Sequence, residues 1–324
     1  MATMRRIAVM TGGGDAPGMN PAIRAVVRTA AAAGVEVFGV RQAYSGLLAG
    51  DFERLTARDV SGILQRGGTI LQTARNLEFK EPQGQKRGLR RLNENGIDGL
   101  IVIGGDGSLR GALALYRLGF PVVGVPGSID NDMWGTNMSI GVDTALNTIL
   151  DAIDKLRDTA SSHERCFLLE VMGRNCGYLA LMGGILGGAE FIAIPEHEIT
   201  LEEIGQKLEE AYMKGKSHAM GIIAEGATLK IHEIAEYLEK HEIGFEVRMT
   251  VLGHVVRGGK PSAFDRLLAT RLGVRAVELL LAGQSGIMVG LHGREIGTVS
   301  LEDATSKQRE VGEEYIQMAD MLAK

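Results

Sequence analysis

The sequence has few cysteines and no long hydrophobic run. Cys166 and Cys176 are the only cysteines in 324 residues, so a disulfide framework is excluded, and neither has metal-ligand spacing to histidine neighbours. We expect reduced thiols in the cytosol. Residues 177–194 are weakly polar but contain Glu190 and five glycines, which favours a buried helix followed by a strand over a membrane span. The five-residue apolar run after Arg6 is too short for a signal-peptide core, so we expect a cytoplasmic protein.

An excess of basic residues is also missing. The 35 Lys and Arg face 40 Asp and Glu, for a net charge of −5, which argues against nucleic acid or an anionic membrane as a partner. Hydrophobic residues make up 45% and charged residues 23% of the chain, which suits a globular protein of one large or two ordinary domains. Only 7 prolines occur, whereas 45 glycines are about twice the usual share of ~7%. The glycines cluster, which indicates binding loops lined by backbone.

Short β-branched runs alternate with segments of helical period along the whole chain. Runs at residues 7–11, 99–105 and 121–127 read as strands, and residues 22–33 and 262–282 as helices. This alternation predicts βαβ units and largely parallel sheets. We expect an α/β protein with two doubly wound, three-layer domains, between which the chain crosses more than once. The expected domains are residues 1–141 plus about 256–305, and residues 142–255 plus about 306–324.

Three glycine-rich loops follow predicted strands. They cover residues 12–18 (GGGDAPG), 104–108 (GGDGS) and 126–132 (PGSIDND). In open parallel sheets, ligands bind beyond the carboxyl ends of the strands, where amide N–H groups and helix N-termini favour phosphate. A tight turn is the alternative for any single cluster. Three loops from one sheet edge predict a shared phosphate site.

The usual nucleotide fingerprints are missing. No G-x-x-x-x-G-K-[ST] occurs, and no G-x-G-x-x-G follows a strand, which disfavours P-loop enzymes and NAD dehydrogenases. Instead, Asp106, Asp130 and Asp132 lie in the predicted phosphate loops. Carboxylates beside an anionic nucleotide require a divalent cation, and we expect Mg²⁺. One carboxylate of the SIDND segment could then accept the proton of an alcohol during phosphoryl transfer, although an exposed acidic turn is the ordinary explanation of such a pair.

Several arginines near strand ends or loops could bind phosphate groups. A guanidinium group binds phosphate oxygens in pairs, although a surface ion pair is the alternative for each arginine. His254 could donate to the same phosphate, but a lone histidine is more often structural. The arginines are Arg75, Arg165, Arg174, Arg248 and Arg257.

An ordered set of motifs makes the chain recognisable. GGGDAPGMN, RGGTILQTAR, GGDGS, PGSIDND, RDTASSHER, EVMGR, GGAE, AEG and TVLGHVVRGG occur in this order between about Ile7 and Gly290. This set resembles bacterial ATP-dependent 6-phosphofructokinases. The resemblance implies direct in-line transfer from ATP to the 1-hydroxyl of fructose 6-phosphate with Mg²⁺, giving fructose 1,6-bisphosphate and ADP in glycolysis. It also implies a homotetramer whose first domain holds ATP and whose second domain holds the sugar phosphate.

The resemblance assigns roles to individual residues. Asp130 becomes the base, Asp106 the magnesium ligand, Asp132 the catalytic neighbour of the base, and Ser128 stands where the family usually has threonine. Arg174 contacts both the sugar phosphate and the transferring group. The nucleotide cradle is Gly14, Arg75, Asn76, Asp106, Gly107 and Ser108. The sugar-phosphate set is Ser128, Ile129, Asp130, Arg165, Met172, Gly173, Arg174, Glu225, Arg248, His254 and Arg257, in which Arg165 and Arg248 come from a neighbouring subunit.

Two glycines favour ATP over pyrophosphate as the donor. Family members that use pyrophosphate resemble GGDDS and PKTIDND at these loops, whereas Gly107 and Gly127 here leave the space for the α-phosphate open. A pyrophosphate-dependent enzyme and a kinase for another sugar phosphate are the enzymatic alternatives. A metabolite-binding sensor without catalysis is the alternative from another class.

The family's effector site is matched only in part. Ala57, Gly62 and Ser217 depart from its pattern, and each lost charge removes a possible contact with phosphate or metal. We therefore expect a weakened or altered response to ADP and phosphoenolpyruvate. The matching residues are Arg24, Arg28, Arg157, Glu190, Lys214 and Lys216.

Overall fold

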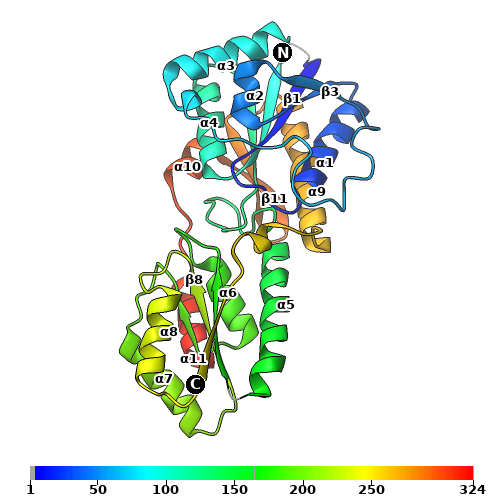
Figure 1. Cartoon of the computed structure of the whole chain (residues 1–324). Helices are drawn as coiled ribbons and strands as arrows, with labels where there is room; N and C mark the ends of the chain where they lie inside the picture. The colour runs from blue at the N-terminus through cyan, green and yellow to red at the C-terminus, as the bar shows by residue number, and fades with distance from the viewer. Residues whose placement is uncertain (1–3, 164, 324) are drawn as a thin grey trace. The chain divides into compact units, whose positions relative to one another are not determined.

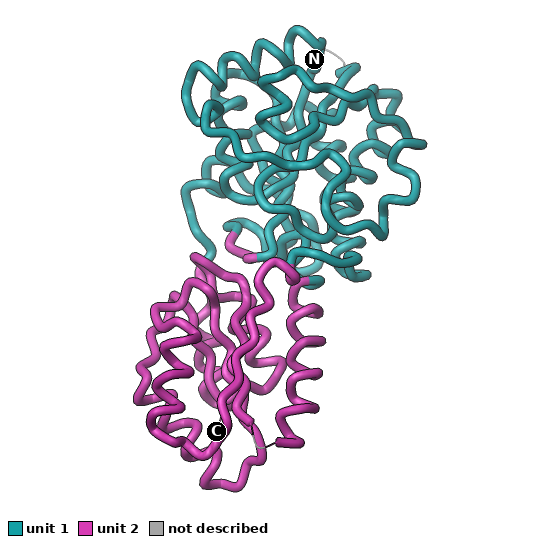
Figure 2. The backbone as a smooth tube through the Cα atoms, in the orientation of Figure 1, with its two compact units in different colours: residues 1–129, 133–144, 257–309 teal, residues 130–132, 145–256, 310–324 magenta. Residues whose placement is uncertain are grey.

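Two units make up the chain in the computed structural model, which describes residues 4–163 and 165–323 (Figure 1). The first unit comprises residues 1–129, 133–144 and 257–309, and the second comprises residues 130–132, 145–256 and 310–324 (Figure 2). The chain therefore passes between the units several times. The sequence-based boundaries stood near residues 141, 256 and 305.

The first unit is built on a seven-stranded sheet. Its five central strands are parallel, and an antiparallel strand closes each edge. β1, β4 and β5 are fully or almost fully buried, as expected for parallel strands covered on both faces. In spatial order the strands are β11 (Glu295–Ser300), β10 (Ile287–His292), β5 (Val122–Pro126), β4 (Gly99–Gly104), β1 (Arg6–Gly12), β2 (Glu36–Val40) and β3 (Phe52–Leu55).

Helices cover both faces of this sheet, which makes three layers (Figure 1). On one face α1 packs against α9, and Gly273 makes this approach possible because a Cβ there would lie 2.8 Å from Ala25 Cβ. On the other face, Leu47, Leu92 and Leu109 enter a hydrophobic core with Met10 and Val102 of the sheet. The helices are α1 (Met19–Ala32), α2 (Ala43–Ala49), η1 (Glu78–Lys80), α3 (Pro82–Glu94), α4 (Asp106–Arg117), α9 (Ala263–Leu281) and α10 (Leu301–Ser306).

The second unit has a smaller sheet of four parallel strands. The spatial order is β7 (Phe191–Ala193), β8 (Ala219–Ala224), β6 (Arg165–Val171) and β9 (Glu246–Val251). Ile204, Leu208, Ile234 and Leu238 pack against one face, whereas α5, α6 and α11 lie on the other. The helices are α5 (Val142–Ser161), α6 (Tyr178–Gly187), α7 (Leu201–Met213), α8 (Ile231–Lys240) and α11 (Glu313–Leu322), with η2 (Gly253–Arg257) after β9.

The expected α/β architecture is confirmed, including the helix and strand within residues 177–194, which are α6 and β7. The edge strands β3 and β11 and the helices α10 and α11 were not expected. Both edge strands carry exposed polar residues, so their apolar pattern is weak, and α11 contains no buried residue. Among the described residues, no helix combines the length and apolar character needed to cross a membrane.

Candidate active site

The three glycine-rich loops leave the sheet of the first unit at the same level. β1, β4 and β5 are adjacent and parallel, and their last residues are in register, with Gly12 opposite Gly104 and Gly104 opposite Pro126. The carboxyl ends of the three strands therefore form one edge. This is the position at which an open parallel sheet binds its ligand.

Contacts between the loops are close because glycines stand where they meet. A Cβ on Gly12 would lie 2.5 Å from Ser108 Oγ, and one on Gly14 would lie 2.0 Å from Arg257 Nη1. Arg257 Nη1 donates to the carbonyl oxygen of Asp15 at 3.3 Å. Ser128 lies beside the second loop, with its Cβ 3.6 Å from the Cβ position of Gly105. The first unit thus brings Gly14, Ser108, Ser128 and Arg257 to this edge.

A cavity of about 760 Å³ in the first unit is lined in part by the loops after β1 and β4. One part of its wall is aromatic, since the rings of Tyr44 and Phe79 stack with centroids 4.1 Å apart. The Tyr44 hydroxyl donates to the carbonyl oxygen of Ser108 at 2.6 Å, and burial raises the pKa of this tyrosine, which keeps it protonated. The cavity is lined by Gly13, Tyr44, Ala74, Arg75, Asn76, Leu77, Phe79, Lys80, Gln85, Asp106, Gly107, Ser108, Arg110 and Gly111.

The segment that carries Arg75 and Asn76 is fixed by a buried amide. Asn20 of α1 is 1% exposed, and its side chain donates to the carbonyl oxygens of Arg66 at 3.0 Å and Gly67 at 3.1 Å. Its Oδ1 accepts a hydrogen bond from Ile70 N at 2.8 Å. These three bonds hold the segment that leads to the cavity. Asn76 then accepts from Phe79 N at 2.8 Å, which begins η1.

Asp106 is the acidic residue of the cavity wall. It opens α4, and its carboxylate accepts hydrogen bonds from Arg110 Nε at 2.9 and 2.8 Å. Gly107 follows it, and a Cβ there would meet no atom within 4 Å, so this side of the wall is open. Gly127 has less free space than Gly107. A Cβ on Gly127 would lie 3.3 Å from Met19 Cε, the end of a flexible side chain.

In the second unit, the carboxyl ends of β6 and β8 also lie at one edge of the sheet. Val171 is opposite Ala224, so Met172, Gly173, Arg174 and Glu225 follow neighbouring strand ends. Glu225 N donates to Val171 O at 2.9 Å, and Gly226 N donates to Gly173 O at 3.1 Å, which joins the two loops. Gly173 adopts φ +142°, a value that side chains disfavour. Arg174 is exposed.

Two of the predicted phosphate ligands lie toward the other end of this sheet. Arg165 begins β6 and Val171 ends it, so the two residues lie about 20 Å apart along the extended strand. Arg248 is opposite Phe167 in the register, and both arginines pair with Glu246. Within one chain, Arg165 therefore does not lie with Arg174. His254 follows β9 and is exposed.

Asp130 and Asp132 lie on the loop after β5, close in sequence to Ser128, and both are partly exposed. Asn131 between them is buried with φ 52°.

The two cysteines are poor candidates for a catalytic nucleophile. Burial raises the pKa of Cys176 to about 12 and raises that of Cys166 as well, so both thiols stay protonated at neutral pH.

A sequence profile described as phosphofructokinase matches residues 6–280. The chain belongs to the phosphofructokinase family. An ATP-dependent 6-phosphofructokinase of Thermotoga neapolitana is 49% identical over 99% of this chain and 100% of its own length. One of Bacillus pumilus is 50% identical over the same shares.

Solved phosphofructokinase structures share the fold. The Saccharomyces cerevisiae phosphofructokinase is 38% identical with a TM-score of 0.87, covering 93% of this chain, which spans 45% of the yeast chain. A pyrophosphate-dependent phosphofructokinase from Marinobacter aquaeolei is 20% identical with a TM-score of 0.85, covering 99% of this chain and 91% of that one. At that identity, the likeness concerns the fold alone.

The effector residues expected for this phosphofructokinase fall into two groups. Arg157 donates to the carbonyl oxygens of Gly187 and Gly188 in the second unit. Glu190, 7% exposed, accepts from Lys216 Nζ at 3.0 Å and from Met220 N at 2.6 Å. In the same unit, Lys214 pairs with Glu210. Arg24 and Arg28 lie on α1 of the first unit.

The sequence analysis missed part of the wall of the 760 Å³ cavity. Tyr44 follows β2, so the rule that ligands lie beyond strand ends could have found it. Arg110 stands four residues after Asp106, the spacing of neighbours on one helix face. No sequence pattern pointed to Phe79 and Lys80 as cavity residues, because tertiary packing alone brings η1 to the cavity.

Proposed function

We propose that this chain is an ATP-dependent 6-phosphofructokinase that transfers the γ-phosphoryl group of ATP to the 1-hydroxyl of fructose 6-phosphate. The observation that carries the proposal is the in-register edge of β1, β4 and β5, with three glycine loops of which the first two line the 760 Å³ cavity. A glycolytic role in the cytoplasm follows from this activity. The first unit is the ATP-binding domain, and the second is the sugar-phosphate domain.

Magnesium fits the residues present. Among the described residues, no group of three or more His, Cys, Asp or Glu could hold a metal ion, which disfavours an all-protein cage. Mg²⁺ is commonly bound by one or two carboxylates, with substrate phosphates and water completing the octahedron. Asp106 supplies such a carboxylate, with its side chain 45% exposed at the cavity wall. When bound with ATP, the ion neutralises charge on the transferring group.

The chain's own residues provide the remaining steps. Asp130 accepts the proton of the 1-hydroxyl, which makes the oxygen nucleophilic. Asp132 is the catalytic neighbour of this base, and Ser128 binds the sugar beside it. Arg174 binds the transferring group and the sugar phosphate through its planar fork. Gly14, Arg75, Asn76, Gly107 and Ser108 bind the nucleotide through backbone and side-chain donors. The transfer is direct and in line, with no covalent enzyme intermediate.

The sugar phosphate is bound by residues of two copies of the chain. Ile129, Met172, Gly173, Glu225, His254 and Arg257 come from one copy. Arg165 and Arg248 of a neighbouring copy complete the 6-phosphate site, which agrees with their distance along the sheet from Arg174. The assembly is a homotetramer with shared active sites, and neither nucleic acid nor a membrane is a partner.

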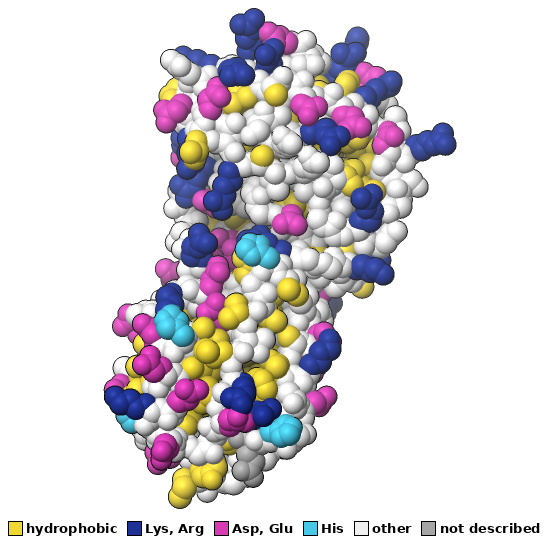
Figure 3. All heavy atoms as spheres, in the orientation of Figure 1, with side chains coloured by type: hydrophobic (Ala, Val, Ile, Leu, Met, Phe, Trp, Pro, Cys, Tyr) yellow, Lys and Arg dark blue, Asp and Glu magenta, His cyan; other side chains and the backbone are white. Residues whose placement is uncertain are grey.

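The edge strand β9 supports this assembly. Within the described residues, β9 pairs with β6 on one side and with no strand on the other, and its Met249 and Val251 are 52% and 59% exposed. Figure 3 shows hydrophobic side chains gathered on the face of the second unit where Figure 1 draws this strand in front. An exposed apolar edge strand favours pairing or burial against another chain.

Asp130→Ser tests the chemistry. Binding of MgATP and of fructose 6-phosphate, measured by calorimetry, should survive, whereas turnover in a coupled assay should fall by about 10² to 10⁴. Unchanged turnover would falsify the assigned base. A sensor without catalysis would show binding but no turnover in the unaltered protein.

The enzymatic alternatives are separated by substrate. Steady-state rates with ATP and with pyrophosphate, each with and without Mg²⁺, identify the donor. Specificity constants for fructose, tagatose and sedoheptulose phosphates identify the acceptor. We expect ATP with Mg²⁺ and fructose 6-phosphate to give the highest values.

A further inference from the structure

The wall of the nucleotide cavity contains an ion pair that none of the proposed steps uses. Arg110 Nε donates to both carboxylate oxygens of Asp106, at 2.9 and 2.8 Å. Both residues line the cavity, and their side chains are 61% and 45% exposed. Within the described chain, the two outer nitrogens of this guanidinium have no hydrogen-bond acceptor.

The charges in the cavity wall indicate how the Asp106–Arg110 ion pair affects the binding of an anionic nucleotide. Arg75, Lys80 and Arg110 are basic lining residues, and Asp106 is the acidic one. A bare carboxylate at this place repels the phosphates of a nucleotide that carries no metal. A magnesium ion removes this repulsion by binding the carboxylate and the phosphates together. Arg110 removes it without a metal, because its Nε already neutralises the carboxylate.

We infer that Arg110 is a specificity-determining residue that lets the cavity accept metal-free nucleotide by neutralising Asp106. The inference rests on the proposed nucleotide site. Arg110 thereby sets the ratio between the affinities for metal-free ATP and for MgATP. In the presence of Mg²⁺, the metal supplies the same neutralisation and Arg110 becomes nearly redundant.

The test is equilibrium binding of ATP in EDTA and in excess Mg²⁺ by calorimetry, which needs no turnover. In Arg110→Gln, the Kd for metal-free ATP should rise about fivefold, the size of one unit-charge interaction near water, whereas the Kd for MgATP should change less than about twofold. Arg110→Lys, which keeps the charge, should keep the ratio of the unaltered protein within about twofold.

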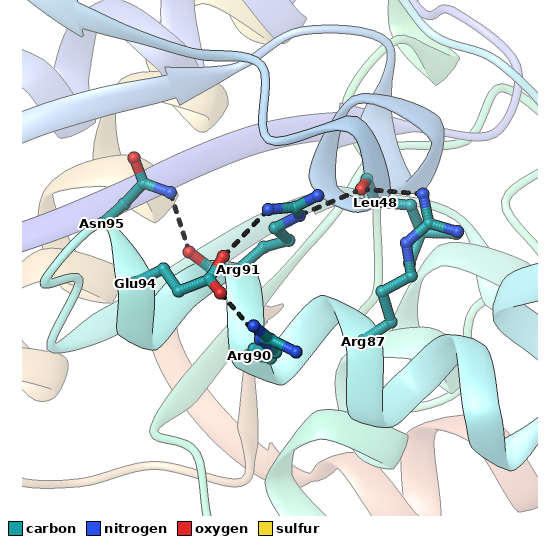
Figure 4. A network of polar contacts seen from close by, with 6 residues as sticks. All are labelled: Leu48, Arg87, Arg90, Arg91, Glu94 and Asn95. Atoms are coloured by element: carbon teal, nitrogen blue, oxygen red, sulfur yellow. Dashed lines mark hydrogen bonds and ion pairs between the residues drawn. The ribbon is translucent and has the colours of Figure 1, made fainter.

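A matched control lies on α3. Arg90 Nε binds Glu94 at 2.7 Å, also four residues apart and exposed, but Arg90 does not line the cavity (Figure 4). Arg90→Gln should leave both Kd values unchanged. In the background Asp106→Asn, Arg110→Gln should no longer change the ratio, because the carboxylate that needs neutralising is gone.

The outcomes separate this inference from the proposed function. An equal loss of affinity for both forms in Arg110→Gln, or no loss for metal-free ATP, overturns the inference and leaves the nucleotide site standing. Tighter binding of metal-free ATP by that variant overturns it as well. If the unaltered protein binds neither form, the proposed function is wrong and the inference fails with it.

Discussion

Replacing Gly107 by alanine should separate the stability of the protein from its nucleotide binding. Gly107 is the second residue of α4, and a Cβ there meets no protein atom within 4 Å. Alanine in a helix is favoured over glycine, so the free energy of unfolding should rise by about 0.5–1 kcal/mol. The added methyl group occupies the open side of the cavity wall. It should weaken MgATP binding by about tenfold or more, the usual effect of one extra carbon in a fitted pocket.

The assay pairs urea denaturation with calorimetric titration of MgATP. Gly111→Ala, on the same helix and in the same cavity wall, is the contrast for stability, because its Cβ would lie 2.4 Å from the Tyr44 ring. That variant should lose about 1–3 kcal/mol of stability through overpacking. If Gly107→Ala binds MgATP as tightly as the unaltered protein, the nucleotide does not occupy this wall.

Three further predictions concern residues outside the cavity wall. Asn20→Leu removes three partly buried hydrogen bonds to residues 66–70, so it should lower the free energy of unfolding by about 3 kcal/mol. It should also raise the KM for ATP more than it lowers kcat. Burial raises the pKa of the Asp265 carboxyl group in the folded protein above its unfolded value. The stabilisation that this carboxyl group provides is therefore complete below about pH 4 and is lost as the pH rises through the folded-state pKa. Urea denaturation across this range should show Asp265→Asn less stable than the unaltered protein, with a gap that narrows as the pH rises; a widening gap would contradict the sign. ADP or phosphoenolpyruvate should shift the fructose 6-phosphate saturation curve only weakly, and a strong shift would show that Ala57, Gly62 and Ser217 do not impair the effector site.

The sequence was sufficient for the main features of the fold. Strands buried on both faces show as short continuous apolar runs, and helices buried on one face keep an apolar repeat of about 3.6 residues. Glycine clusters mark the loops after β1, β4 and β5, because amides need open access to bind an anion. The same reasoning failed at β3 and β11, whose exposed polar residues hide the pattern.

Other features depend on which elements become neighbours in space. Strand register and packing between distant segments decide three of these features. They are the place of Arg165 at the far end of β6, the stacking of Tyr44 on Phe79 and the direction of a Cβ on Gly127. Local sequence encodes periodicity and turn chemistry, but the pairing of strands and the closure of a cavity are decided by the burial of the whole core. The sequence by itself therefore determined the kinds of residues available to bind a phosphate, and the tertiary structure decided which of them one chain brings together.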